Sequence, residues 1–286
     1  MTAKPLVSII ITTKNEAVNI GACINSIQKQ SYENIEILVI DNNSSDATKE
    51  ISKRAGVLVY DKGPERSVQR NFGAKIAKGQ YVLFIDADMI LLAKIVEECV
   101  RVIDQSIVDK KELIALVIPE ISIGTGFWAQ CKALERSFYV GVSWIEAARF
   151  YKKEAFNKLG GYDETLTGPE DFDIHQRLRD LYGNRAIGRI SLLIHHNEGN
   201  LSLWKVMKKK FYYARNLKRY AKKVSNKGYY KKQADLFARY KIFFKNPFLL
   251  FRNPCIGLGM LILKTAEFGA GFSGYIYYSY FNRKLL

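Results

Sequence analysis

Short apolar segments alternate with helical patterns through residues 1–90, and this alternation limits the fold of the chain more than any other feature. β-Branched and aliphatic runs predict buried strands at residues 7–11, 35–40, 57–60 and 81–85. Apolar side chains at helical spacing predict helices between the strands, one of them starting at a cap supplied by Ser45 or Asp46. Strands that alternate with helices form parallel βαβ units, so we expect an α/β fold with a mainly parallel sheet.

Polar residues follow these strands at the points where the strands end. Thr12 to Asn15, Asp41 and Asp86 are far apart in sequence, yet each comes at the carboxyl end of a predicted strand. Ligands of open α/β sheets bind outside this edge. The sequence therefore predicts a ligand site at one edge of the sheet.

Asp86 and Asp88 are two residues apart on an extended segment, so their carboxylates point the same way. Two such groups repel each other unless a cation lies between them, and oxygen ligands suit Mg²⁺ or Mn²⁺, which also bridge diphosphates. A solvated acidic turn is the alternative explanation. The preceding apolar strand and the other strand-end residues favour a metal site.

The net charge of +16 suggests a nucleic-acid partner, but its distribution does not. Residues 201–286 contain 19 Lys and Arg against Asp235 and Glu267 alone, whereas residues 1–200 are nearly neutral. We therefore expect a globular domain at 1–200, followed by a basic segment at 201–286.

At this point the motifs resemble those of inverting glycosyltransferase family 2, whose members have the GT-A (Rossmann-like) nucleotide-sugar-binding fold. The matching segments occur in the family's order at residues 11–16, 39–46, 69–73, 86–88, 159–164 and 168–171. The resemblance covers roughly residues 5–200 and implies a nucleotide-sugar donor, linked to UDP or GDP. The sequence departs from the family pattern at Asp41-Asn42, where the family often has two acids. The nucleotide base of the donor, uracil or guanine, is therefore left undecided.

The resemblance implies roles for individual residues. Asp41 would bind the base, and Arg70 would lie near the donor phosphates. Asp86 and Asp88 would hold the metal and diphosphate. The whole implied donor set is Thr12, Asn15, Glu16, Asp41, Asn43, Arg70, Asp86 and Ala87.

Glu170-Asp171 precedes a helical pattern, and acids at helix starts are common caps. The resemblance implies instead that Asp171 is the catalytic base, with Glu170 more often structural. Asp171 would take the proton of an acceptor hydroxyl as it attacks the anomeric carbon with inversion. An acceptor phosphate is already ionised, and Asp171 would then orient or bind the acceptor.

The histidines add one further candidate ligand. His195 and His196 follow the apolar run 190–194, which we interpret as a strand with both histidines at its end. The family often supplies a metal ligand here, and His196 matches its position better. His175 is interpreted as structural or solvent-facing.

Residues 203–223 form a long helical pattern with one aromatic and one basic face, typical of a helix on anionic lipid. A basic helix packed on the domain is the alternative, and Lys208 to Lys210 could instead contact the donor diphosphate.

Residues 242–251 and 254–281 are strongly apolar. Lys264 and Glu267 interrupt the second run and can pair on a helix. We expect membrane association through a hairpin or re-entrant segment, with helix packing or dimerisation as the alternative.

Four widely spaced cysteines indicate reduced thiols, and the N-terminal residues show no signal-peptide pattern, which predicts a catalytic domain that faces the cytoplasm. We expect transfer of a hexose, such as mannose or glucose, to a lipid-linked glycan or polyprenyl phosphate. Two alternatives are a nucleic-acid or anionic-polymer binder that uses the basic segment, and a pyrophosphorylase. The first leaves the strand-end acids without a role, so we expect no nucleic-acid partner. The second lacks a glycine-rich phosphate loop.

Overall fold

The computed structural model describes residues 4–224 and 227–281 and divides into two compact units. Unit 1 comprises Met1–Pro119, Ala147–Glu164 and Arg177–His196. Unit 2 comprises Glu120–Glu146, Thr165–Gln176 and Asn197–Leu286. The units interleave along the chain, whereas the division at residue 200 rests on charge and motifs and remains a proposal.

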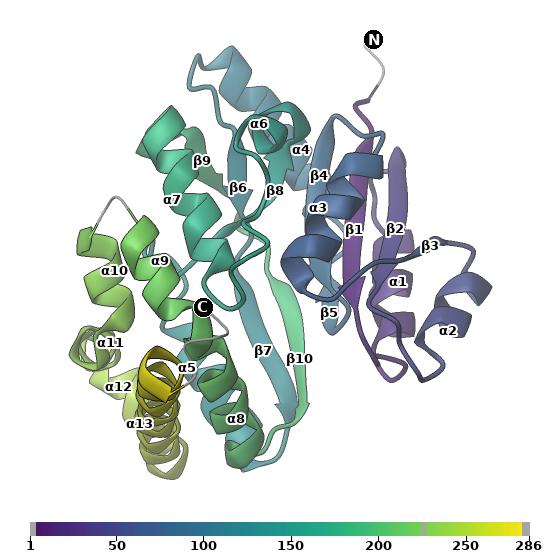
Figure 1. Ribbon diagram of the computed structural model, residues 1–286. Coiled ribbons are helices and arrows are strands. Elements are labelled where there is room, and N and C mark those ends of the chain that lie inside the picture. Colours follow the sequence, from purple (N-terminus) through teal and green to yellow (C-terminus); the bar gives the residue numbers. More distant parts are fainter. Residues whose placement is uncertain (1–3, 225–226, 282–286) are drawn as a thin grey trace. The chain divides into compact units, whose positions relative to one another are not determined.

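A seven-stranded sheet in unit 1 has the strand order β3-β2-β1-β4-β8-β6-β9 (Figure 1). Its strands are β1 (Val7–Thr13), β2 (Ile35–Asp41), β3 (Leu58–Asp61), β4 (Tyr81–Asp86), β6 (Ala115–Val117), β8 (Ala148–Lys152) and β9 (Ile187–Arg189). Only β8 runs antiparallel to its neighbours, so the predicted α/β fold with a mainly parallel sheet is confirmed.

Helices cover both faces of this sheet. They are α1 (Ile20–Gln28), α2 (Thr48–Arg54), α3 (Arg66–Ile76), α4 (Ile95–Val108) and α6 (Lys153–Lys158), with a short 3-10 turn at Asn184–Ala186. Ile9 and Ile11 of β1 belong to the core cluster that includes α1 and α4. Ile10 points the other way, as strand alternation requires, and lies so close to Gly73 of α3 that a Cβ there would clash.

The start of α2 differs from the prediction. The capping position is Ala47, not Ser45 or Asp46. Asp46 nevertheless accepts a hydrogen bond from the Thr48 amide (3.0 Å), because a short carboxylate can reach an amide two residues ahead.

The predicted strand before His195 was also placed wrongly. Residues 190–193 are not a strand, and β10 (Ile194–Asn200) begins there, so both histidines lie at its start. Its first residues pair antiparallel with β5 (Met89–Leu91), with His196 opposite Met89. This register brings His196 beside Asp88, because Asp88 immediately precedes β5.

Unit 2 is mainly helical and contains the strand β7 together with the second part of β10. Strand β7 spans Glu120–Thr125, and the helical elements are α5 (Phe127–Ser137), the start of α7 (Glu170–Tyr182), α8 (Leu203–Tyr213), a 3-10 turn at Ala214–Asn216, α9 (Leu217–Lys223), α10 (Lys227–Ala234), α11 (Leu236–Phe243), α12 (Pro247–Phe251), α13 (Pro254–Ile276) and a π-helical turn at Tyr277–Phe281. The predicted helix at 203–223 is therefore interrupted.

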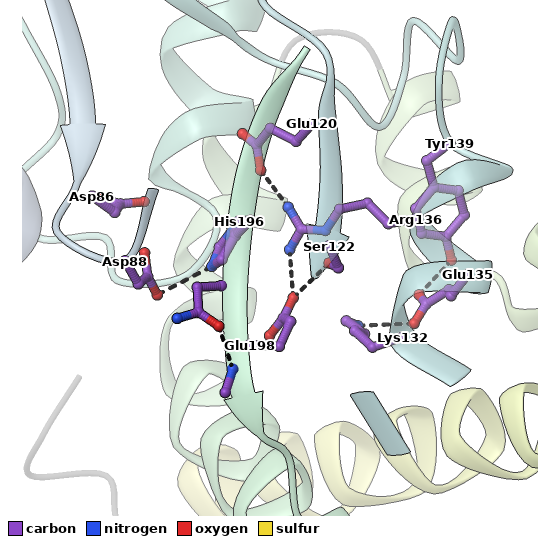
Figure 2. Close-up of polar contacts among 12 residues, drawn as sticks. Asp86, Asp88, Glu120, Ser122, Lys132, Glu135, Arg136, Tyr139, His196 and Glu198 are labelled. Carbon is purple, nitrogen blue, oxygen red and sulfur yellow. Dashed lines mark hydrogen bonds and ion pairs between the residues drawn. The ribbon is translucent and has the colours of Figure 1, made fainter. Parts of the chain in front are cut away.

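Charged side chains join the elements of unit 2. Arg136 forms ion pairs with Glu120 and with Glu198, and Glu198 also accepts a hydrogen bond from Ser122 at 2.8 Å (Figure 2). These contacts link α5, β7 and β10. Every charge in the set has a partner of opposite sign, which favours a structural role.

A second set of charges, which we call the ion cluster, consists of Lys132, Glu135, Lys264 and Glu267. Lys132 lies 2.8 Å from each carboxylate, and Lys264 pairs with both, so the predicted Lys264–Glu267 pair is confirmed. All four side chains are at least four-fifths buried. The ion cluster therefore fastens the polar side of α13 to α5.

Small residues bring α13 close to its neighbours in unit 2. A Cβ at Gly259 would lie 2.3 Å from Phe127 of α5, and one at Gly274 would lie 2.4 Å from the Phe211 carbonyl of α8. Helix α13 and the turn after it, as far as Tyr280, are long and apolar enough to cross a membrane, but such a helix also occurs in soluble cores. Its glycines and its charged pair are used in packing within this unit.

Candidate active site

The loops after β1 and β2 in unit 1 fold against each other through short polar side chains. Asp41 accepts hydrogen bonds from the amide (2.7 Å) and hydroxyl (2.5 Å) of Ser44, and Asn15 accepts one from the Ser45 amide (2.8 Å). Asn15 and Asn43 both have positive φ, a conformation that asparagine tolerates better than most residues. The predicted donor residues of these loops therefore shape the sheet edge themselves.

The sheet register brings the two strand-end acids to the same residue pair of β1. Thr13 lies opposite Asp41 of β2, and Thr12 lies opposite Asp86 of β4. Thr12 also donates a hydrogen bond to Asp86 at 3.1 Å. The predicted convergence of these strand ends is thus seen within unit 1.

Three guanidinium groups surround the carboxylate of Asp86, and we call these four residues the donor cluster. Arg70 lies 3.0 Å from one carboxylate oxygen, and Arg149 and Arg66 lie 3.6 and 3.9 Å from the other. Arg70 is only 1% exposed. Guanidinium groups gathered in this way are suited to binding an anion such as diphosphate.

The arginines keep Asp86 ionised. Burial alone would raise the pKa of this carboxyl group, but the charges of Arg70, Arg149 and Arg66 outweigh burial and hold the pKa well below its ordinary value. Asp86 is therefore an anion across the physiological pH range, and it holds the three guanidinium groups together.

Asp88 and His196 form a second polar pair in unit 1. The His196 Nε2 lies 3.1 Å from Asp88 Oδ2, as Figure 2 shows. The other oxygen of Asp88 is buried and has no hydrogen-bond partner among the described residues. A carboxylate oxygen buried in this way fits a metal ligand, because an unpaired buried charge is otherwise costly.

The third predicted ligand, Asp86, is turned toward arginines. Within the described part of the chain, no group of three or more His, Cys, Asp or Glu side chains is arranged to hold a metal ion. The residues thus fit a cation held by Asp88 and His196 with further oxygens from substrate phosphate and water, the coordination that Mg²⁺ commonly has.

The remaining predicted donor residues lie around this edge. Glu16 is half-buried and accepts a hydrogen bond from Asn19 (2.8 Å), and Ala87 is buried between the two aspartates. Asn43 is exposed.

The segment at residues 159–164, distant in sequence, contacts Arg70 and its neighbour Asn71. Asn71 bonds to the amide and carbonyl of Tyr162, both at 2.8 Å, and the Tyr162 ring lies 5.1 Å from the Arg70 guanidinium. Gly161 has positive φ, and a Cβ there would meet the Asn71 side chain at 2.5 Å. The motifs at 69–73 and 159–164 therefore act together to place Arg70.

Glu170 and Asp171 belong to unit 2 and occupy the first turn of α7. Glu170 is 1% exposed and Asp171 is half-buried. The preceding loop is held by Arg219, which donates to the Thr165 carbonyl, by Arg215, which donates to Thr167, and by Tyr213 against Gly168. The start of α7 is thus tied to the residues that follow α8.

The three lysines of α8 have separate surroundings in unit 2. Lys208 lies over Trp204 and Lys209 over Tyr213, whereas Lys210 lies 4.0 Å from Glu267 of the ion cluster. His175 is buried, not solvent-facing.

Two further residues at this site were not predicted from the sequence, and the role of a third was left open. Arg66 escaped notice, although it lies four residues before Arg70 on α3 and so shares its helix face. Gln69 lies in the matched segment 69–73 but received no role; its amide donates to the carbonyls of Thr13 and Ile40 and joins β1 to β2. The sequence leaves Arg149 open between shaping an acceptor site and packing, and in the structure it contacts Asp86.

Curated relatives match the N-terminal part of the chain. Glycosyltransferase AglE of Haloferax volcanii is 37% identical over 93 residues, which are 29% of this chain and 31% of the relative. An Escherichia coli protein named UDP-Glc:alpha-D-GlcNAc-diphosphoundecaprenol beta-1,3-glucosyltransferase WfgD is 38% identical over 32% of this chain and 38% of its own length. The chain thus spans only about a third of the length of these relatives.

Solved structures match nearly the whole chain in fold. The mannosyltransferase PcManGT of Pyrobaculum calidifontis, solved in complex with GDP-Man and Mn²⁺, has a TM-score of 0.66 at 16% identity, over 98% of this chain and 88% of that one. S. aureus TarS 1–349 has a TM-score of 0.55 at 16% identity, over 96% and 91%. These likenesses establish the GT-A fold.

The profile of glycosyl transferase family 2 matches residues 8–163, which is more than half of the chain. This span contains the strand-end loops, Arg66, Arg70, Arg149 and the two aspartates of the donor site. The chain therefore belongs to glycosyl transferase family 2.

Proposed function

We propose that this protein is a metal-dependent, inverting glycosyltransferase that moves a hexose from a UDP- or GDP-sugar to an acceptor at a membrane surface. The observation that carries the proposal is the set of three guanidinium groups around Asp86, close in sequence to Asp88, whose Oδ1 is buried without a hydrogen-bond partner among the described residues. Together they form a site for a diphosphate and a divalent cation. Such a diphosphate is the part that all nucleotide-sugar donors of this type share.

The chain's own groups account for donor binding and departure. Arg66, Arg70 and Arg149 bind the diphosphate and stabilise the negative charge that grows on it as the bond to the sugar breaks. Because Asp86 holds these groups in place before the donor arrives, little reorganisation is needed during the reaction. Asp88 and His196 would hold a divalent cation, which would supply further stabilisation of the departing nucleoside diphosphate.

Asp171 is the proposed base toward an acceptor hydroxyl. It accepts the hydroxyl proton while the oxygen attacks the anomeric carbon from the side opposite the leaving group, which inverts the configuration. Glu170 is more deeply buried and supports the helix start. Toward an ionised phosphate acceptor, Asp171 would bind or orient the acceptor instead.

The acceptor class is supported by the relatives. The WfgD protein is named for transfer to a sugar on diphosphoundecaprenol, as is a Campylobacter jejuni relative that is 35% identical over 99 residues. We propose a lipid-linked glycan or a polyprenyl phosphate as acceptor, and a catalytic part that faces the cytoplasm.

The donor half of the proposal is tested by thermal unfolding with UDP and with GDP, each with and without Mn²⁺. Ligand at a hundred times its dissociation constant adds ~2.7 kcal/mol to the free energy of unfolding. We expect a metal-dependent shift with one nucleotide, which identifies the donor class. We expect the shift to be lost in Asp86→Ala and in Asp88→Asn and kept in the control Asp180→Asn, on the exposed part of α7. A folded protein that responds to neither nucleotide would contradict the proposal.

The acceptor half is tested with radiolabelled UDP-glucose and GDP-mannose, each offered to undecaprenyl phosphate and to GlcNAc-diphosphoundecaprenol. Asp171→Asn should lose transfer to the sugar hydroxyl by ~10²-fold or more, as expected for a missing general base, while the nucleotide-induced stabilisation persists. Normal turnover to a hydroxyl in this variant would rule out the base role.

A further inference from the structure

Unit 2 exposes a set of large apolar side chains that its core does not use. We call the set the apolar face; its members are Phe237, Phe244, Phe248, Phe251, Leu258 and Ile262, which are 74%, 51%, 81%, 44%, 58% and 48% exposed. Single exposed apolar residues are ordinary, but a contiguous group marks an interaction surface.

The apolar face is continuous across α11, α12 and the start of α13, which lie next to one another in Figure 1. Phe237 and Phe244 are seven residues apart, two turns along α11. The rings of Phe244 and Phe251 are 6.5 Å apart. Phe251 in turn lies against Gly257, beside Leu258, and Ile262 follows one turn later. The members therefore form one surface.

Positive charge predominates beside this surface, and the exposed acid next to it, Asp235, caps α11. Residues 236–266 contain no Asp or Glu. The cations at its border, Lys241, Lys245 and Arg252, are exposed. The two other cations of the segment point inward, since Arg239 stacks on Tyr139 and Trp144, and Lys264 belongs to the ion cluster.

The backbone that carries the apolar face is held in place by helix caps. Asp235, Asn246 and Asn253 each accept a hydrogen bond from the second or third amide of the helix that follows, and Pro247 and Pro254 occupy the first turns. The aromatic side chains are thus presented on a preformed support, which lowers the entropy cost of binding.

These observations distinguish among the surfaces that could cover the face. A two-fold dimer would set this cationic border against its own copy, and like charges would repel. A membrane-spanning α13 would have to break the ion cluster, which holds its polar side against α5. A bilayer with anionic lipid satisfies both the aromatic side chains and the bordering cations.

We propose that the apolar face docks on the surface of a bilayer that contains anionic lipid. The rings of Phe244, Phe248 and Phe251 enter the interface between headgroups and acyl chains, and Lys241, Lys245 and Arg252 bind lipid phosphates. Helix α13 lies on the protein side of this contact and does not cross the bilayer. The proposal concerns residues outside the donor site, so it stands or fails independently of the transfer chemistry.

Flotation of the full chain with vesicles tests this proposal. We expect binding to phosphatidylcholine vesicles that contain phosphatidylglycerol and weaker binding to phosphatidylcholine alone. We also expect partial release in 0.5 M salt, which is about three times physiological ionic strength and screens the attraction between the cations and the lipid phosphates. Phe244→Ser with Phe248→Ser should weaken binding by ~100-fold or more, because each of the two buried rings contributes about a tenfold factor or more. Lys241→Gln with Lys245→Gln should weaken it mainly on anionic vesicles.

Two controls keep the result interpretable. Phe272→Ser changes an equally exposed phenylalanine of α13 outside the apolar face and should bind as the parent chain does. The melting temperature and the nucleotide-induced shift should be the same in all variants, which shows that the donor site is intact.

Three outcomes would overturn the proposal. Binding that is unchanged in the Phe244/Phe248 variant places the contact elsewhere. Binding that resists alkaline carbonate indicates that α13 spans the bilayer. A chain that ignores vesicles but changes from dimer to monomer in the Phe244/Phe248 variant assigns the face to a second copy.

Discussion

The donor cluster of unit 1 and the ion cluster of unit 2 are both groups of largely buried charges, but they differ in composition. In the ion cluster, two lysines meet two glutamates, with Lys210 at 4.0 Å on the exposed side. In the donor cluster, three arginines share the single carboxylate of Asp86. Lysines and glutamates that pair with each other inside the chain serve packing, whereas several guanidinium groups around one carboxylate are suited to binding a further anion.

The largest effect that tests this comparison is expected in the ion cluster. Glu267→Ala removes one carboxylate and leaves buried lysines without it, so the free energy of unfolding should fall by about 3–5 kcal/mol. Urea denaturation at neutral pH measures the loss. The double variant Lys264→Met with Glu267→Gln keeps the Lys132–Glu135 pair and should lose less than Glu267→Ala. Equal losses in both variants would mean that charge balance is not what the cluster provides.

The same cluster predicts how stability changes with acid. Burial acts to raise the pKa of Glu135, but Lys132 and Lys264 outweigh it and lower the pKa from an ordinary value of 4.5 to about 2. Because the folded-state pKa is the lower one, this stabilisation is present above the ordinary value and is lost as pH falls from about 4.5 toward about 2.

Urea midpoints measured between pH 7 and pH 3 check this expectation. Glu135→Gln should flatten the decline, while Glu33→Gln at an exposed position should not. A parent chain whose stability stays constant over this range, or rises toward acid, would contradict the assignment of paired charges.

The smallest effect is expected in the donor cluster. Arg66→Gln removes the guanidinium group that is farthest from Asp86 (3.9 Å) and one-third exposed, so the free energy of unfolding should change by no more than ~0.5 kcal/mol. Affinity for the preferred nucleoside diphosphate should fall by ~10-fold, since a hydrogen bond to a charged group contributes at least ~1.5 kcal/mol. Calorimetric titration measures the affinity, and Arg101→Gln on the exposed side of α4 is the control. A strongly destabilised variant with normal affinity would make this cluster structural as well.

Much of unit 1 was predictable from the sequence because its signals are local. The apolar runs that became β1, β2 and β4 are continuous and end in polar residues, and parallel strands bring such ends to one edge. Asp86 and Asp88 were therefore recognisable as a site before any contact was known. The Lys264–Glu267 pair was predictable for the same reason, since three residues separate neighbours on a helix.

The tertiary structure alone decided which side chains share a contact across long sequence separations. Whether Arg149 packs or binds depends on β8 pairing with β4, and the placement of His196 beside Asp88 depends on the register of β10 against β5. The apolar pattern of α13 is compatible with a membrane span or a packed helix, and only the tertiary structure shows that its two charged side chains pair with Lys132 and Glu135 of a distant helix. Local sequence patterns determine where helices and strands form. The register between paired strands and the burial of charged side chains depend on partner residues that lie far away in the sequence.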